Sequence, residues 1–431
     1  MNISCFRFFS EASALAISLP NWKVVDEVIM NVERSGGGTT VFGSGNLEEL
    51  AGQLGSGKYS AVFLNHPMLK GTQHAALIEA LGAPVFDRHS VILHIFKTYT
   101  RSEVAKLQIA LAEIPYIRAR LKTMHDSGYE WMEESHAELV DRTGSGSGAE
   151  TFWQNRYYLL QRREGQIKKR LAAIRLRRDQ QLKEQKSSIT RAPLVSILGY
   201  TNAGKTSLIQ CLTKDLSCQP LDRLFATLDV SQHPGRLPNG QALLYADTVG
   251  FISHLPPHLL ASFHATIDHI AASDLLVHIR DLSHPDTLAQ KDNVLATLHQ
   301  LGLPAPLQEG MLEVGNKIDL IASRDVGSLN LDKDAALVSC ASREGLGDLV
   351  SMLELRLQEA LGSFERVFRV GSGSAEASFL YDAGVVTETI PDPDAKGALL
   401  FLRTLITPAI AQQFTSRFPA FAPTTRARHR Q

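Results

Sequence analysis

The stretch APLVSILGYTNAGKTSLIQCL, Ala192 to Leu212, decides the fold class. An apolar run typical of a buried strand leads into a loop with two glycines, and a helical pattern follows. The loop, Gly199 to Thr206, matches G-x-x-x-x-G-K-[ST], in which backbone N–H groups surround phosphates at a helix N-terminus. Because the motif lies between a strand and a helix, an accidental glycine-rich turn is the disfavoured alternative.

This phosphate loop predicts which groups hold a nucleotide. The Lys205 ammonium is expected at the β- and γ-phosphates, and the Thr206 hydroxyl is expected on Mg²⁺. The nucleotide-binding residues expected here are Gly199, Tyr200, Thr201, Asn202, Ala203, Gly204, Lys205, Thr206 and Ser207.

Two later segments follow in the order that a nucleotide-hydrolysing switch requires. LFATLD supplies Thr227, which is expected to close over Mg²⁺ and the γ-phosphate, and ALLYADTVG supplies Asp247, which is expected to hold Mg²⁺ through water. The N–H of Gly250 is expected at the γ-phosphate. The predicted Mg²⁺ ligands are thus Thr206, Thr227 and Asp247. The predicted catalytic residues are Lys205, Thr227 and Gly250. The expected nucleotide contacts also include Asp247, Thr248, Val249 and Gly250.

The base is predicted to be guanine. GNKIDL places Asn316, Lys317 and Asp319 after a strand pattern, and a carboxylate at Asp319 can accept from both the ring N–H and the exocyclic amine of guanine. Adenine lacks that donor pair. VSCASREG adds Ser339, Cys340 and Ala341, whose backbone can approach the base. GTP or GDP with Mg²⁺ is therefore the expected cofactor.

Phe251 follows the switch glycine, at a position where many GTPases carry a glutamine that orients the attacking water. Its side chain can form no hydrogen bond to water. Two readings remain open: hydrolysis stimulated by a partner, or a slow GTP-dependent binder in which Phe251 only packs beneath the switch.

Composition sets outer limits on function. The chain has 431 residues, 44% hydrophobic and 21% charged, with a formal net charge of -1, so any nucleic-acid surface must be local. Its four cysteines, Cys5, Cys211, Cys218 and Cys340, form no C-x-x-C pair, which argues against a zinc ribbon or disulfide scaffold and suits a reducing compartment. No membrane anchor is expected. The N-terminus fits a short transit peptide or an ordinary flexible start equally well.

Changes of pattern along the chain predict an α/β protein of several parts. A P-loop domain with a mostly parallel sheet is preceded by a small α/β domain with a helical-hairpin arm and followed by a small α+β tail. The expected ranges are 1–21 for a flexible start or presequence remnant, 22–99 for the N-terminal domain, 100–190 for the arm, 191–362 for the P-loop domain, 363–420 for the C-terminal domain and 421–431 for a basic tail.

The arm's second helix, 151–186, combines a packing seam with an excess of positive charge. Trp153, Leu160, Ile167 and Ile174 recur every seven residues, which predicts packing on the preceding helix. The helix has eleven Lys or Arg against three acidic residues, a surplus of eight positive charges. A solvated face is the ordinary explanation, but the imbalance favours a nucleic-acid contact. The residues assigned to RNA are Lys168, Lys169, Arg170, Arg175, Arg177 and Arg178.

Taken together, GYTNAGKTSL, LFATLD, DTVGFISHLPPHLLASFHATIDHIAASDLLVHIRDLSHPD and NKIDL resemble the HflX family of ribosome-associated GTPases. VFDRHSVILHIFKTYTRSEVAKLQIALAEIPY resembles the family's N-terminal domain and first arm helix, and SFLYDAGVVTETIP resembles its animal mitochondrial branch. Two departures stand out: the expected arm tip reads GSGSGAET rather than G-P-G-E-T, and Cys340 replaces a usual alanine.

The resemblance implies a GTPase that binds the large ribosomal subunit and its rRNA, in ribosome splitting or large-subunit maturation. It implies a mitochondrial matrix location, with the cytoplasm as the alternative, and a monomer. Family members also carry a hydrophobic residue after D-T-V-G, so Phe251 fits partner-stimulated hydrolysis. Two other functions stay open: a regulatory switch that binds protein effectors, and an RNA-processing or tRNA-modifying GTPase.

Overall fold

The computed structural model describes residues 9–30, 41–55, 59–121, 149–187, 192–213, 224–225, 227, 230–253, 270–321, 329–393 and 398–421. The chain forms two compact units. The N-terminal unit comprises Met1–Arg177, Asp222–Asp229 and Ile252–Thr266, and the C-terminal unit comprises Arg178–Leu221, Val230–Phe251 and Ile267–Gln431. Both segments expected to act as switches therefore contribute residues to the N-terminal unit.

The N-terminal unit is built of helices around a short parallel sheet. Strands β1 (Val62–Leu64) and β2 (Val85–Asp87) pair in parallel, with Val62 opposite Val85. Helices α3 (Ser44–Leu54) and α4 (Gly71–Leu81) pack beside them on a core that includes Phe42, Leu69 and Leu77.

Helix α2 (Phe9–Ile17) differs from the flexible start expected for 1–21. Ala12, Leu15, Ala16 and Leu19 are all buried, which is the i, i+3, i+4, i+7 spacing of an amphipathic helix. The apolar stripe therefore holds this segment in a helix on the N-terminal unit, where the sequence predicted a flexible start.

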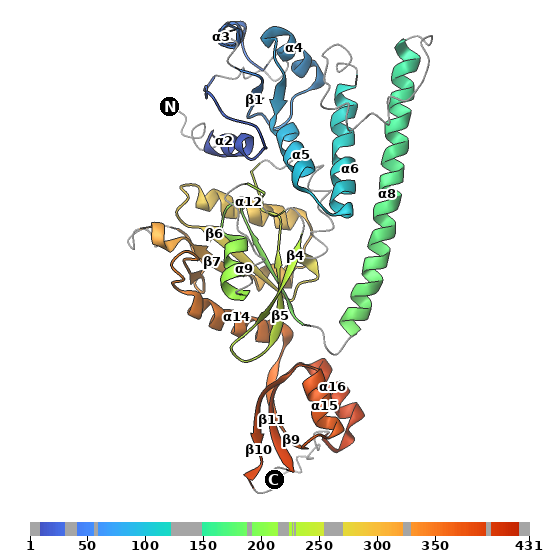
Figure 1. The fold of residues 1–431 in the computed structure, drawn as a ribbon, viewed down its shortest axis with the longest axis vertical. Helices are drawn as coiled ribbons and strands as arrows, with labels where there is room; N and C mark the ends of the chain where they lie inside the picture. Colours follow the sequence, from blue (N-terminus) through green and yellow to red (C-terminus); the bar gives the residue numbers. More distant parts are fainter. Residues whose placement is uncertain are drawn as a thin grey trace, which may run out of the picture. The chain divides into compact units, whose positions relative to one another are not determined.

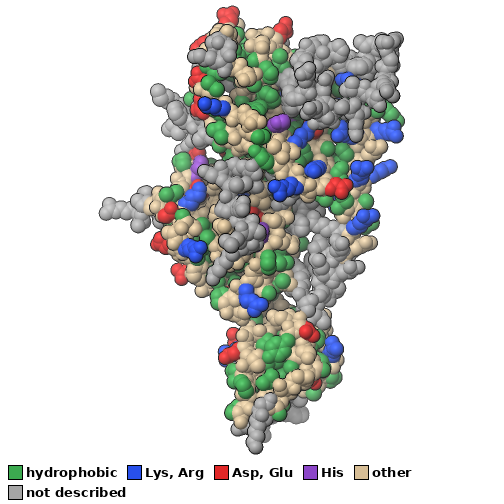
Figure 2. All heavy atoms as spheres, in the orientation of Figure 1, with side chains coloured by type: hydrophobic (Ala, Val, Ile, Leu, Met, Phe, Trp, Pro, Cys, Tyr) green, Lys and Arg blue, Asp and Glu red, His purple; other side chains and the backbone are tan. Residues whose placement is uncertain are grey.

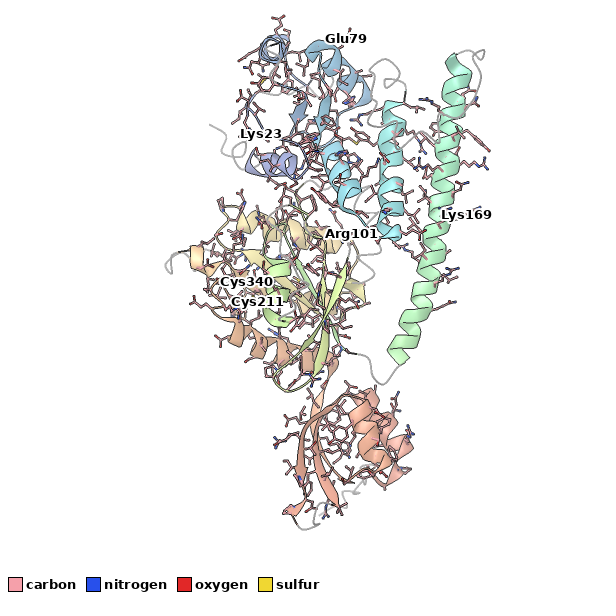
Figure 3. All side chains as sticks on the ribbon, viewed as in Figure 1. Lys23, Glu79, Arg101, Lys169, Cys211 and Cys340 are labelled. Carbon is pink, nitrogen blue, oxygen red and sulfur yellow. The ribbon has the colours of Figure 1, made fainter. Side chains whose placement is uncertain are left out.

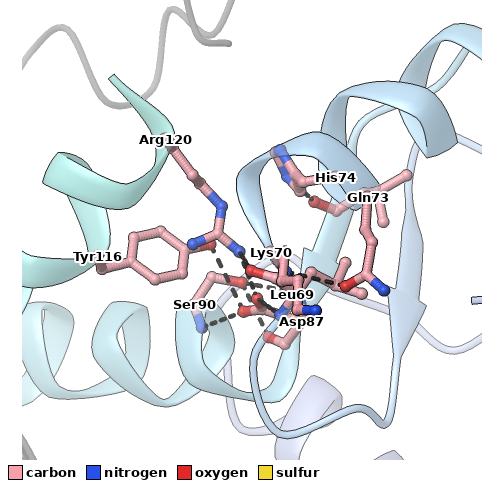
Figure 4. A network of polar contacts seen from close by, with 9 residues as sticks. Leu69, Lys70, Gln73, His74, Asp87, Ser90, Tyr116 and Arg120 are labelled. Carbon is pink, nitrogen blue, oxygen red and sulfur yellow. Dashed lines mark hydrogen bonds and ion pairs between the residues drawn. The ribbon is translucent and has the colours of Figure 1, made fainter. Parts of the chain in front are cut away.

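A buried ion pair joins β2, α5 (Arg88–Tyr99) and α6 (Glu103–Arg120), as Figure 4 shows. Asp87 caps α5 by accepting the Ser90 N–H at 2.8 Å, and its other oxygen accepts from Leu69 N at 2.9 Å and from Arg120 Nη2 at 2.6 Å. The Arg120 guanidinium lies 3.6 Å from the centroid of the Tyr116 ring. One carboxylate thus ties three elements together with charge-assisted hydrogen bonds.

The expected helical arm consists of α6 and α8 (Ala149–Ser187), which run side by side in Figure 1. Leu160 and Ile167 of α8 are buried against Ile114 and Ile117 of α6, so the seven-residue repeat does mark the seam. Pro115 lies inside α6, which continues to Arg120. The expected tip, Gly144 to Gly148, and the side chains of Trp153 and Arg178 lie outside the described residues.

The C-terminal unit contains a six-stranded sheet of order β4-β5-β3-β6-β7-β8, in which β4 alone runs antiparallel to its neighbour. The strands are β3 (Leu194–Gly199), β4 (Ser231–Arg236), β5 (Ala242–Asp247), β6 (Leu275–Asp281), β7 (Leu312–Asn316) and β8 (Ala336–Leu337). The helices between and after these strands, up to residue 361, are α9 (Lys205–Thr213), α12 (Thr287–Gln300), α13 (Ala305–Glu309), η3 (Ile318–Leu320) and α14 (Leu346–Leu361). β3, β6 and β7 are buried along almost their whole length, as parallel strands covered on both faces require.

The chain ends in a small α+β arrangement, as expected. Strands β9 (Phe364–Gly371), β10 (Val386–Pro391) and β11 (Leu399–Ile406) form an antiparallel sheet of order β10-β11-β9. Helices α15 (Ala375–Asp382) and α16 (Pro408–Arg417) add Phe379 and Phe414 to its core, and η6 (Pro419–Phe421) follows. The described helices include none with the length and hydropathy that crossing a membrane demands.

The Arg120–Asp87 pair yields the first prediction. Both side chains are 0% exposed, so Arg120→Met leaves a buried carboxylate without its cation, which costs about 3–5 kcal/mol. The three tryptophans, Trp22, Trp131 and Trp153, all belong to the N-terminal unit, so urea unfolding followed by tryptophan fluorescence reports on it. Lys168→Met breaks the exposed pair with Glu164 and should cost about 0–1 kcal/mol. Equal losses in the two variants would contradict the prediction.

Candidate nucleotide-binding site

The phosphate loop lies between β3 and α9, where the backbone passes too close to its neighbours for a side chain. A Cβ on Gly199 would lie 2.3 Å from the carbonyl oxygen of Ile279 in β6. At Gly204 φ is +99°, and a Cβ would lie 2.2 Å from Asn316 Nδ2. Only glycine fits both places, so the two glycines of the motif are explained by the close approach of Ile279 and Asn316.

Lys205 is the first residue of α9 and is 7% exposed. Its Nζ donates to the carbonyl oxygens of Tyr200 at 2.9 Å and Gly199 at 3.3 Å, which curls the loop around the ammonium group. Burial lowers the pKa of Lys205 to about 8, and the Asp247 carboxylate opposes this shift. The ammonium is therefore held inside the loop, at the place where the motif expects phosphate.

Thr206 and Asp247 meet at the start of α9 and the end of β5. Thr206 Oγ1 donates to Asp247 Oδ2 at 2.6 Å. A hydroxyl and a carboxylate are the hard oxygen donors that Mg²⁺ prefers, so the chemistry of these two groups fits the expected metal. Thr227, the third expected ligand, belongs to the N-terminal unit, so the structure unites two of the three within one unit.

The segment after β5 pairs with the phosphate loop through its backbone. Thr201 N donates to Phe251 O at 2.8 Å and Phe251 N donates to Gly199 O at 3.1 Å, which forms an isolated parallel bridge between Tyr200 and Phe251. A Cβ on Gly250 would lie 2.8 Å from Thr201 Cγ2 and 3.0 Å from Lys205 Nζ. The Gly250 backbone is thus placed against the lysine, and Phe251 contributes its main chain to the loop.

The two segments expected to contact guanine are connected through one amide side chain. Asn316 Nδ2 donates to Ala203 O at 2.9 Å, and Asn316 Oδ1 accepts from Cys340 N at 3.2 Å. Lys317 has φ +65° and its Nζ donates to Asp281 Oδ2 at 2.7 Å. Asn316 therefore holds the phosphate loop and the loop around Cys340 in one arrangement.

The remaining residues expected to contact the nucleotide differ in whether their side chains are hydrogen-bonded within the protein or exposed. Thr248 Oγ1 donates to Ile197 O at 2.6 Å, so its side chain is committed to β3 and only its backbone could reach a ligand. Ser339 Oγ accepts from Ser342 N at 3.0 Å, which shapes the base loop. Asp319 and Ala341 are exposed, so a ligand can reach both residues.

Sequence reasoning missed a cluster in which Arg88, at the start of α5, holds Ser253. Arg88 Nη2 donates to Ser253 O at 2.9 Å, and Ser253 Oγ donates to both carboxylate oxygens of Glu11, at 2.7 and 2.8 Å. Glu11 and Arg88 also form an ion pair. Ser253 is 7% exposed and Arg88 is 3% exposed. The segment DRH in the N-terminal domain offered no chemical signal for this contact.

A second missed contact lies on the same helix. Phe225, two residues before Thr227, is 1% exposed and lies edge-on to Phe96 of α5, with ring centroids 4.7 Å apart. Its φ of +55° is uncommon for a bulky side chain and persists where packing holds it. Helix α5 therefore binds residues from both segments that the sequence assigns to switches.

Comparisons with known proteins agree over nearly the whole chain. Residues 8–97 match the family described as GTP-binding GTPase N-terminal, 100–185 match GTP-binding GTPase Middle Region, and 194–317 match 50S ribosome-binding GTPase. GTP-binding protein 6 of Xenopus laevis is 41% identical over 385 residues, covering 88% of this chain and 69% of the relative. The human counterpart is 38% identical over 417 residues, with 95% and 76% covered. GTPase HflX of Magnetococcus marinus is 33% identical over 348 residues, with 80% and 77% covered.

The chain belongs to the HflX family of GTPases. The expected resemblance and α/β fold are confirmed, and the protein is a GTP-hydrolysing enzyme. A solved structure, a complex of SsGBP with GDP, aligns at a TM-score of 0.48 and 23% identity over 82% of this chain and 97% of that one.

The buried lysine of this HflX-family GTPase yields a prediction about pH. The protonated ammonium attracts phosphate, so GDP affinity should be full below about pH 8 and should fall as the pH rises above the pKa of Lys205, by up to about tenfold per unit. Fluorescence titration with labelled GDP between about pH 7 and 9 measures this, since the last phosphate ionisation, near pH 6, is complete there. The side chain of the Lys205→Arg variant stays protonated throughout this range. Its GDP affinity should therefore not change with pH, whether it is high or low. A flat profile for the parent would contradict the prediction.

A third prediction concerns the base. Asp319→Asn removes a carboxylate expected to accept two guanine hydrogen bonds, each worth about 1.5–3 kcal/mol when charged. GTP binding should weaken by at least tenfold, and xanthosine triphosphate, whose exocyclic oxygen accepts from the new amide, should bind better than GTP. Calorimetry with both nucleotides decides this. The exposed Asp348→Asn should change neither affinity, and an Asp319→Asn protein with parental GTP affinity would refute the guanine assignment.

Proposed function

We propose that this GTPase binds the large ribosomal subunit through its rRNA, with α8 as the RNA-contacting element. The observation that carries the proposal is a row of exposed cations on α8. Lys169, Arg170 and Arg177 are exposed and form no ion pair with any residue that the structure describes. Figure 2 shows Lys and Arg side chains gathered on the part of this face formed by α8, and Figure 3 labels Lys169 among them.

The charge of α8 is only partly balanced from within the arm. Glu164 accepts from both Lys168 at 2.6 Å and Arg118 of α6 at 2.7 Å. These contacts lower the pKa of Glu164 and keep it ionised. Arg118 also lies 5.0 Å from the Tyr157 ring centroid. Lys168 is thus a weaker candidate for a phosphate contact than Lys169 and Arg170, because its charge already has a partner.

The nucleotide chemistry that we propose follows from the phosphate loop. Lys205 and the backbone N–H groups of the loop bind the β- and γ-phosphates, and Asp319 selects guanine. Thr206 and Asp247 would hold Mg²⁺, with Thr227 joining them when GTP is bound. Bound Mg²⁺ would neutralise charge on the β- and γ-phosphate oxygens. The Gly250 N–H then stabilises the γ-phosphate, beside the lysine against which its backbone lies.

Phe251 supports the view that hydrolysis depends on a partner. Its side chain cannot orient water, and its main chain is already committed to the phosphate loop. The water must then be positioned by other groups, and a large partner that places the segment of Thr227 over the γ-phosphate would help to supply them. Groups supplied in trans can be worth roughly 10³–10⁵ in rate. We infer slow intrinsic turnover that ribosomal subunits accelerate.

For the cellular role we propose recycling of ribosomes or maturation of the large subunit in the mitochondrial matrix. The family description 50S ribosome-binding GTPase and the two animal relatives support this. A relative from Arabidopsis thaliana that is 34% identical over 307 residues carries the name GTP-binding protein, chloroplastic, which places an organellar protein among the relatives. We propose that the protein acts as a monomer, because a ribosome ligand needs no symmetry.

Reversing two exposed charges on α8 tests the RNA contact. Lys169→Glu combined with Arg170→Glu should cut binding to large subunits at least tenfold and flatten its salt dependence, since each lost phosphate contact removes roughly 0.7–0.9 from the log–log slope. Sedimentation at several salt concentrations measures both. Basal GTP turnover should stay within about threefold of the parent, because neither residue belongs to the nucleotide site.

The matched control reverses two exposed lysines away from α8, Lys23→Glu with Lys333→Glu, for the same change in net charge. It should bind subunits like the parent. Equal binding by the α8 variant and the parent would refute the proposal and favour a switch that acts on protein effectors. Equal loss in both variants would reduce the effect to general electrostatics and refute α8 as the specific element.

A further inference from the structure

Two cysteines of the C-terminal unit lie together beside the base-reading loop. Cys211 is on α9, six residues after Lys205, and Cys340 is in the loop that follows β8. Cys211 Sγ donates to Cys340 O at 3.5 Å, so the Cys211 thiol lies against the backbone of Cys340. Figure 3 labels both residues next to each other. Both are free thiols and half-buried.

We propose that Cys211 and Cys340 are a redox-active pair that a small disulfide oxidant joins in an intramolecular disulfide, and that this bond weakens guanine-nucleotide binding. The first half of the proposal concerns the pair alone. The second half rests on the proposed role of the Cys340 backbone in the base site, so the two halves have separate measurements.

The reaction is thiol–disulfide exchange in two steps. Cys211 loses its proton, and its sulfur attacks oxidised glutathione to form a mixed disulfide and one molecule of reduced glutathione. The Cys340 sulfur, deprotonated in turn, attacks the Cys211 sulfur, forms the internal disulfide and releases the second glutathione. Two protein thiols are oxidised and one glutathione disulfide is reduced to two thiols.

The order of the steps follows from burial. Burial and the neighbouring Cys211 thiol raise the pKa of Cys340 to about 12, so Cys340 is a poor first nucleophile. Once the mixed disulfide has formed at Cys211, Cys340 attacks it within the same molecule. This proximity offsets the weak acidity of the Cys340 thiol. We expect oxidation over minutes to hours rather than seconds.

The effect on nucleotide binding follows from what Cys340 holds. Its N–H donates to Asn316 Oδ1, and the same amide donates to Ala203 O of the phosphate loop. A disulfide holds its sulfurs at about 2.05 Å, so its formation replaces the Cys211 Sγ contact with Cys340 O by a covalent bond to the Cys340 sulfur. The new bond ties the Cys340 loop to α9, and we expect it to disturb the Asn316 connection and the backbone proposed to face the base. We expect the oxidised protein to bind GDP about tenfold more weakly, the effect of losing one ordinary hydrogen bond or slightly more.

The test uses the full chain with Cys5→Ser and Cys218→Ser, so that the pair supplies the only thiols. Incubation in glutathione buffers of graded redox potential, alkylation and peptide mass spectrometry should reveal a Cys211–Cys340 crosslink that a reductant reverses. Cys211→Ser in the same background should give no internal crosslink and, when reduced, should bind GDP like its parent. Failure to form the crosslink at any potential would overturn the proposal, whether or not the nucleotide site is correctly assigned.

The nucleotide half is tested by reciprocity. If the disulfide weakens GDP binding tenfold, saturating GDP must make the disulfide easier to reduce by the same factor, which is about 30 mV for a two-electron couple. Labelled GDP titrations of the oxidised and reduced proteins should agree with that shift. A crosslink that forms with equal GDP affinity and an unmoved midpoint would overturn the regulatory half. Parallel loss of GDP affinity in oxidised Cys211→Ser would assign the effect to glutathione adducts and also overturn it.

Discussion

The close approach of main chains around Lys205 is the constraint on which the site depends. At Gly199, Gly204 and Gly250 a single added carbon would lie between 2.2 and 2.8 Å from a neighbouring atom. The phosphate loop can therefore curl around the ammonium only where three glycines remove side chains from its path. The buried lysine, the Thr206–Asp247 pair and the Phe251 bridge all depend on that crowding. Asn316 extends the same arrangement to the base, since its amide bonds the phosphate loop and the Cys340 loop together.

Helix α5 of the N-terminal unit contacts residues from both expected switch segments. Helix α5 presents Arg88 to Ser253 and Phe96 to Phe225, two turns apart on one helix. The same helix is capped by Asp87, whose charge Arg120 of α6 neutralises. A chain of packed elements thus connects the arm's first helix with both segments that the sequence assigns to switches. An event that moves the arm has a physical path to residues near Thr227, because these contacts are buried and specific.

Positive charge is concentrated on one helix of the chain. The whole chain carries a formal charge of -1, yet α8 concentrates cations on its exposed face while its apolar stripe faces α6. Packing therefore uses one side of this helix and leaves its cations on the other. A helix with this division can contact a phosphate backbone without disturbing its own seam, as the proposed RNA contact requires.

The sequence by itself determined the local chemistry. The phosphate loop, the guanine motif, the heptad seam of α8 and its charge surplus could be read from residue type and spacing, since each depends on neighbours within a few turns of the chain. The tertiary structure alone decided what distant segments do to one another. No spacing rule pairs Glu11 with Ser253, places Phe225 against Phe96 or brings Cys211 to Cys340, because such contacts arise from the packing of elements up to 242 residues apart. The apolar stripe of α2 was visible in the sequence. The hydrogen bond between Glu11 of α2 and Ser253 of the second switch segment was not.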